Sequence, residues 1–156
     1  MRLVDFLSPQ SVFADLKATD KKSVIEEIVG FVASNIPDVP REVVERALVD
    51  REKLGSTGIG HGVALPHGRV KGLYEIKVYF CRSMKGVDYK STDRAPVHLF
   101  FVILSPENST SSHLKVLAIV SNLLKNPDFR GNLFSATNAA ELYTVIAEAD
   151  RKNMLA

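Results

Sequence analysis

The stretch VHLFFVILS, residues 97–105, is almost continuously apolar. Such a run predicts a β-strand that is covered on both faces. Shortly before it, YEIKVYFCR (residues 74–82) alternates apolar side chains at Ile76, Val78 and Phe80, which indicates a second strand. We therefore expect a sheet in which residues 97–105 form a central strand.

Four segments on either side of these strands repeat apolar residues at the helical period. We expect helices over residues 18–35, 41–54, 111–126 and 137–152. The expected end signals are Thr19 or Asp20 as the first N-cap, Pro40 in the first turn of the second helix and Gly55 after it, Ser111 or Ser112 as the third N-cap, and Asn138 with Glu141 at capping-box spacing. Helices on both sides of apolar strands predict a two- or three-layer α/β domain.

Length and composition favour one folded domain over residues 1–156, with 46% hydrophobic and 24% charged residues and neither an internal repeat nor a long linker. The net charge of +2, with interspersed signs, excludes a nucleic-acid footprint. One cysteine, Cys81, excludes an intramolecular disulfide and fits a reducing compartment. No signal-like or bilayer-spanning run is present, so we expect a cytoplasmic protein that does not insert into membranes.

A glycine-rich loop, GSTGIGHGVALPHGR (residues 55–69), holds two of the four histidines. It does not match the P-loop, because His61 and Gly62 stand where Lys and Ser or Thr are required. It does not match the dinucleotide fingerprint either, because Val63 occupies the position of the third glycine. We therefore expect no nucleotide cofactor.

The histidines leave two other kinds of chemistry open. His61, His67 and His113 are three nitrogen ligands for a metal-dependent hydrolase, although their spacing is not helical and no HExxH pair exists. Alternatively, His67 is a nucleophile for a phosphoryl group, since an imidazole with a pKa near 6.5 is largely neutral at cytoplasmic pH. Pro66 and Gly68 restrain its backbone and leave room beside it. The positive neighbours that such a group needs are available from Arg51, Arg69, a second imidazole and a helix N-terminus.

Three segments resemble one known family. REKLGSTGIGHGVALPHG (residues 51–68), SSHLKVLAIVSNLL (111–124) and KKSVIEEIVGFVA (21–33) are similar to the fructose/mannitol-type IIA proteins of the bacterial phosphoenolpyruvate-dependent phosphotransferase system. Within that family, the chain most resembles the free-standing nitrogen-regulatory IIA proteins, on REKLGSTGIG and on DFRGNLFSATNAAELYTVI (128–146).

The resemblance implies a mixed β-sheet sandwiched between helices. It implies that His67 accepts a phosphoryl group on Nε2 from a small histidine phosphocarrier protein, that His113 hydrogen-bonds this group and that Arg51 balances its charge. His61, where relatives often carry Asn, Arg69 and Ser112 are expected at the rim. No cofactor and no metal are implied.

The leading hypothesis is a phosphocarrier, a phosphotransferase component that regulates other proteins through its phosphorylation state. The rival is a sugar-specific IIA component that passes phosphate to a fructose- or mannitol-type IIB partner. A histidine-liganded metal hydrolase and a pure interaction module are the alternatives from other classes. His98, inside the central strand, and Cys81 are expected to be structural.

Overall fold

Strand β6 (Val97–Ser105) lies at the centre of a six-stranded mixed sheet in the computed structural model, which describes residues 1–155. It pairs antiparallel with β5 (Lys77–Val87), whose other edge carries β1 (Val12–Phe13) in parallel. Its second edge carries β3 (Val63–Ala64) and β4 (His67–Arg69), one after the other and both parallel to it. β2 (Gly58–Gly60) closes this side, antiparallel to β3.

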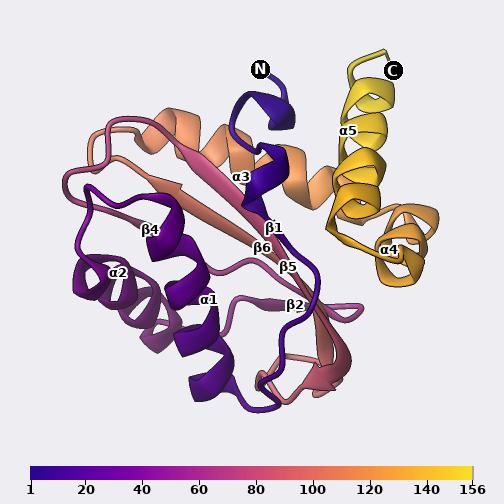
Figure 1. Cartoon of the computed structure of the whole chain (residues 1–156), viewed down its shortest axis with the longest axis horizontal. Helices are drawn as coiled ribbons and strands as arrows, with labels where there is room; N and C mark the ends of the chain where they lie inside the picture. The colour runs from indigo at the N-terminus through magenta and orange to yellow at the C-terminus, as the bar shows by residue number, and fades with distance from the viewer. Residues whose placement is uncertain (156) are drawn as a thin grey trace.

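Successive residues of β6 enter two different cores. Leu99, Phe101 and Ile103 belong to the core under α3, α4 and α5. Phe100, Val102 and Leu104 belong to the core under α1 and α2. Figure 1 shows these two groups of helices on opposite sides of the sheet. Since residues of a strand alternate between faces, a continuously apolar strand fits a sheet with helices on both sides. The predicted mixed sheet between helices is confirmed.

The helices agree with the predicted segments, with one addition. They are α1 (Lys21–Asn35), α2 (Arg41–Lys53), α3 (Thr110–Leu124), α4 (Pro127–Ser135) and α5 (Ala139–Leu155), preceded by the 3-10 turns η1 (Leu3–Asp5) and η2 (Pro9–Ser11). The sequence did not predict α4, which begins with a proline after the cap Asn126, whose side chain accepts from the Asp128 backbone N–H. No helix among residues 1–155 has the length and apolar character to cross a membrane.

Asp20 caps α1 as predicted, because its carboxylate accepts the Ser23 backbone N–H at 2.9 Å. Two other N-caps differ from the prediction. Pro40 is the N-cap of α2 and precedes its first turn. The N-cap of α3 is Ser109, because its carbonyl already accepts the His113 N–H.

At α5, the Asn138 side chain accepts the Glu141 N–H as expected, but the Glu141 carboxylate binds Thr137, so the predicted reciprocal box is incomplete.

The second predicted strand and the glycine-rich loop also differ from expectation. β5 begins at Lys77, after Ile76, and is buried on both faces, because Tyr79 and Cys81 pack into the layer opposite Val78 and Phe80. The loop at residues 55–69 contains β2, β3 and β4. Strands of two or three residues are too short to show an alternation.

Candidate functional site

Three chain segments converge at the carboxyl end of β6. His67, at the start of β4, lies opposite Ile103 of β6. The chain leaves β6 at Ser105 and enters α3 at Thr110, which puts His113 in the first turns of that helix. The last turns of α2 pack on β4, where a Cβ added to Gly68 would lie 2.9 Å from the Ala47 carbonyl oxygen. This close approach requires glycine and brings Arg51 to His67.

The His67 ring is held at both nitrogens. Nδ1 lies 2.8 Å from the Leu65 carbonyl oxygen, and the Arg51 Nε–H donates to Nε2 at 3.1 Å. A carbonyl oxygen can only accept and a guanidinium can only donate. Nδ1 therefore carries the proton, and the lone pair of Nε2 accepts from Arg51.

The surroundings keep His67 neutral. Burial lowers the pKa of His67 below its usual 6.5, and the Arg51 charge lowers it further, while the bond to Leu65 and the Glu52 carboxylate act in the opposite direction. A neutral imidazole is a nucleophile at neutral pH through the nitrogen that carries no proton, which in His67 is Nε2.

The His113 ring lies beside His67, with 5.3 Å between the ring centroids and 49° between the ring planes. Its side chain is buried, and its Nδ1 is 2.5 Å from the Ser105 hydroxyl. Burial lowers the pKa of His113 to about 4, and the neighbouring His67 ring and the Arg69 charge lower it further. His113 is therefore neutral at pH 7.

Arg51 is anchored away from the imidazole. Its Nη1 donates to the Gly55 carbonyl at 3.0 Å, so one guanidinium spans the end of α2 and the histidine. The structure thus brings together His67, His113 and Arg51, the residues to which the resemblance gave catalytic roles.

The predicted rim residues separate into two groups. Arg69 is exposed at the end of β4 and donates to the Thr110 hydroxyl at 2.8 Å, at the start of α3. Ser112 lies partly buried in the first turn of α3. Both are therefore beside His113.

His61 lies elsewhere. It sits in the turn between β2 and β3 with a φ of 58°, and the carbonyl of Gly62 after it accepts the His98 N–H at 2.9 Å, at the start of β6. His67 instead pairs with Ile103, and each intervening residue of β6 adds about 3.3 Å. No group of three or more metal-binding His, Cys, Asp or Glu side chains occurs within residues 1–155. The metal-ligand set of His61, His67 and His113 is therefore not assembled.

Three residues that support the site were not predicted from the sequence. The Leu65 carbonyl and the Ser105 hydroxyl bind the two imidazoles, and the Glu52 carboxylate holds the backbone N–H of Thr57 at 3.1 Å. A backbone carbonyl carries no side-chain signal. In the sequence, Ser105 is a serine at the end of a strand and Glu52 is a charged residue of a helix, and neither position indicates a functional role.

The residues predicted to be structural are placed in the interior or at its margin. Cys81 is fully buried, which raises the pKa of its thiol. His98 is partly buried, and its Nδ1 lies 2.8 Å from the Ser83 carbonyl oxygen.

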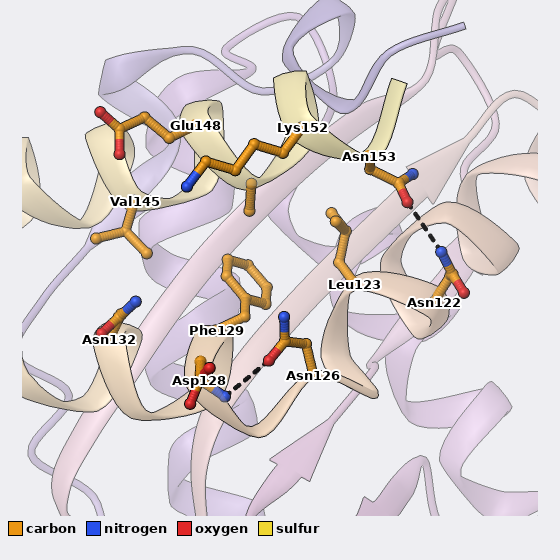
Figure 2. A pocket seen from close by; sticks show the side chains of 11 residues that line it. Asn122, Leu123, Asn126, Asp128, Phe129, Asn132, Val145, Glu148, Lys152 and Asn153 are labelled. Carbon is orange, nitrogen blue, oxygen red and sulfur yellow. Dashed lines mark hydrogen bonds between the residues drawn. The ribbon is translucent and has the colours of Figure 1, made fainter. Parts of the chain in front are cut away.

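A separate polar cavity of about 570 Å³ lies between α3, α4 and α5. Figure 2 shows it lined by amides and by charged side chains, including Asp128, Glu148 and Lys152, with Asn122 hydrogen-bonded to Asn153 across one side. Asn122 lies near the C-terminal end of α3, whereas His113 lies near its start. The cavity shares no residue with the histidine site.

Comparison with known proteins identifies the family. The family model described as "Phosphoenolpyruvate-dependent sugar phosphotransferase system, EIIA 2" matches residues 5–149. A nitrogen regulatory protein of Bradyrhizobium diazoefficiens is 36% identical over 147 residues, which cover 94% of this chain and 95% of that protein. The fructose-specific EIIABC component of Bacillus subtilis is 31% identical over 153 residues, which cover 97% of this chain and 24% of that protein.

Among solved structures, the nitrogen regulatory protein IIA-Ntr of Neisseria meningitidis superposes with a TM-score of 0.83 at 32% identity, covering 91% of this chain and 97% of that one. The resemblance drawn from the sequence is confirmed, and nitrogen regulatory IIA proteins are close homologues. The chain belongs to the EIIA 2 family of the phosphoenolpyruvate-dependent sugar phosphotransferase system.

Proposed function

We propose that this chain is a phosphocarrier that accepts a phosphoryl group on Nε2 of His67 from a histidine phosphocarrier protein. The observation that carries the proposal is the pair of hydrogen bonds on this ring: Leu65 holds the proton on Nδ1, so the lone pair is on Nε2, where it accepts from the Arg51 Nε–H. Membership of a phosphotransferase-system family supports the same reading.

The transfer step needs no proton to leave the site. The Arg51 N–H first leaves Nε2 of His67, and the freed lone pair attacks phosphorus. The bond from phosphorus to the donor imidazole nitrogen breaks, and its electron pair returns to the donor ring. His67 keeps its Nδ1 proton, and the positive charge that develops on the phosphorylated ring is stabilised by the Leu65 carbonyl at 2.8 Å. Such transfers depend mainly on positioning and electrostatics, and no cofactor or metal takes part.

A small number of positively charged or N–H groups surround the position of the phosphoryl group. Arg51 already touches the accepting nitrogen. The start of α3 adds backbone N–H groups without intrahelical partners and the positive end of the helix dipole, and Arg69 lies at the same helix start. A few charges hold a dianion without trapping it, as a carrier that passes its phosphate on requires.

A regulatory role is favoured over sugar transport. The chain is 36% identical to a nitrogen regulatory relative and covers 95% of it, and in this role the phosphorylation state of the chain is the signal. Phosphorylation adds close to two negative charges at one surface position, which changes how target proteins bind. We place the protein in the cytoplasm, which fits one free, buried cysteine.

A second candidate is a sugar-specific role, in which phosphate passes to a fructose- or mannitol-type IIB partner. The match to part of a fructose-specific component supports it.

Intact mass after incubation with phosphoenolpyruvate, enzyme I and a histidine phosphocarrier tests the proposal. We expect one acid-labile phosphoryl group on the wild type and none on His67→Ala. His61→Ala is the matched control, because His61 belongs to the same glycine-rich loop but lies in the turn between β2 and β3, away from His67. This variant should still be phosphorylated. A folded wild type that gains no mass from several donors would refute the carrier role. Subsequent loss of the phosphate to a IIB protein would support the sugar-specific candidate.

A further inference from the structure

The second imidazole of the site is in contact with a buried hydroxyl. Ser105, the last residue of β6, is fully buried, and its Oγ lies 2.5 Å from Nδ1 of His113. The backbone of Ser105 is also engaged, because its carbonyl accepts the Val70 N–H at 2.8 Å, just beyond β4. The residue therefore joins the strand region that carries His67 to the helix that carries His113.

The direction of the bond follows from counting donors and acceptors. A serine hydroxyl has one proton, and a neutral imidazole has one N–H. Among the hydrogen bonds of residues 1–155, the Ser105 hydroxyl makes no other. If Nδ1–H donated to Ser105, the buried hydroxyl proton would lack an acceptor, which disfavours that arrangement by about tenfold or more. The hydroxyl therefore donates to Nδ1.

This direction sets the proton position on His113. With Nδ1 acting as acceptor, the single proton of the neutral ring is on Nε2. Burial keeps the ring neutral, with the pKa of His113 lowered to about 4. Among the described residues, no side chain or carbonyl hydrogen-bonds Nε2.

We propose that Ser105 is a positioning residue that holds His113 as the Nε2–H tautomer, so that its ring donates a hydrogen bond to the phosphoryl group on His67. The inference rests on the proposed function of His67. The two adjacent rings then carry opposite tautomers: Leu65 holds the proton of His67 on Nδ1, and Ser105 directs that of His113 to Nε2. In the other neutral tautomer, His113 would turn a lone pair toward the phosphoryl oxygens and repel them.

Long-range ¹H–¹⁵N correlation NMR of the imidazole nitrogens tests the tautomer directly, on the unphosphorylated full chain at pH 7.5. We expect wild-type His113 to show a protonated Nε2 and an unprotonated, hydrogen-bonded Nδ1. In Ser105→Ala, Nδ1 should lose the signature of an accepted hydrogen bond and the tautomers should mix. Ser111→Ala, an exposed serine of the same helix, is the control and should leave both signals unchanged.

The rate of phosphoryl acceptance from the phosphocarrier is the second measurement. Ser105→Ala should slow single-turnover acceptance about tenfold, the loss of roughly one hydrogen bond in the transition state. Ser105→Thr, which keeps the hydroxyl, should recover part of it. A wild-type His113 with its proton on Nδ1 would overturn the proposal without any variant, and so would an unchanged rate in folded Ser105→Ala. If the wild type accepts no phosphate at all, the proposed function fails, and the NMR result still shows whether Ser105 sets the tautomer.

Discussion

Replacing Glu52 with alanine should destabilise the protein far more than an ordinary helix-surface substitution. Its side chain is only 6% exposed, and its carboxylate binds the Lys21 ammonium at 2.8 Å and the Thr57 N–H at 3.1 Å. It also accepts from the Thr57 hydroxyl. The same ammonium lies 4.7 Å from the centre of the Tyr89 ring. One carboxylate therefore ties α1 and the start of the glycine-rich segment to the end of α2.

The magnitude follows from what the substitution leaves behind. The Thr57 N–H belongs to a buried residue, and losing a charged acceptor costs about 2 kcal/mol. The Thr57 hydroxyl has an alternative partner in the Tyr89 hydroxyl at 3.2 Å, so it adds little. Lys21 is 23% exposed and partly solvated, so its lost ion pair adds about 1 kcal/mol. The total is about 3 kcal/mol, or a fall in Tm of about 6 to 12 °C.

Urea denaturation followed by far-ultraviolet circular dichroism suits a chain without tryptophan. Asp50→Ala is the matched control, because this acid on the same helix is 62% exposed and lies 3.9 Å from Lys53. It should change the free energy of unfolding by less than about 0.5 kcal/mol. The reasoning is refuted if Glu52→Ala, with an unchanged slope against urea, costs no more than Asp50→Ala does.

Three further predictions concern the site and the chain ends. Because burial lowers the pKa of both His67 and His113 in the folded state, the unfolded chain binds protons first as the pH falls; the stability is therefore full above about pH 6.5 and declines toward pH 4. Unfolding free energies at pH 7.5, 6 and 4.5 should show this decline, and His113→Gln should flatten it; an equally steep decline in that variant would contradict the assignment. Gly68→Ala should cost about 1 to 3 kcal/mol in urea denaturation and slow phosphate acceptance, because its Cβ would meet the α2 backbone at 2.9 Å; normal stability and rate would mean that α2 can move away. Asp150→Ala should cost about 2 to 4 kcal/mol, since this buried carboxylate accepts the Leu3 and Val4 N–H groups at 3.0 Å and secures the N-terminus against α5; faster hydrogen exchange at those amides would report the loss, and unchanged exchange would contradict it.

Local sequence patterns were sufficient to predict the central strand and most of the helices. The apolar run at residues 97–105 predicted a strand covered on both sides, and four helical periods predicted four of the five helices, because both patterns are set by residues close in the chain. Pro66 and Gly68 around one histidine singled out His67 as a candidate nucleophile. The family resemblance added Arg51 and His113.

The remaining features depend on contacts between distant residues. β1 to β4 are too short to carry a period and exist because β5 or β6 supplies their hydrogen bonds, directly or through β3. The spacing left open whether all three of His61, His67 and His113 come together, and the pairing of β3 and β4 along β6 brings only His67 to His113. The proton on His67 sits on Nδ1 because a carbonyl and a guanidinium reach its two nitrogens from different segments. Burial, hydrogen-bond direction and pKa arise only when the chain has folded, because each depends on neighbours that the sequence does not place side by side.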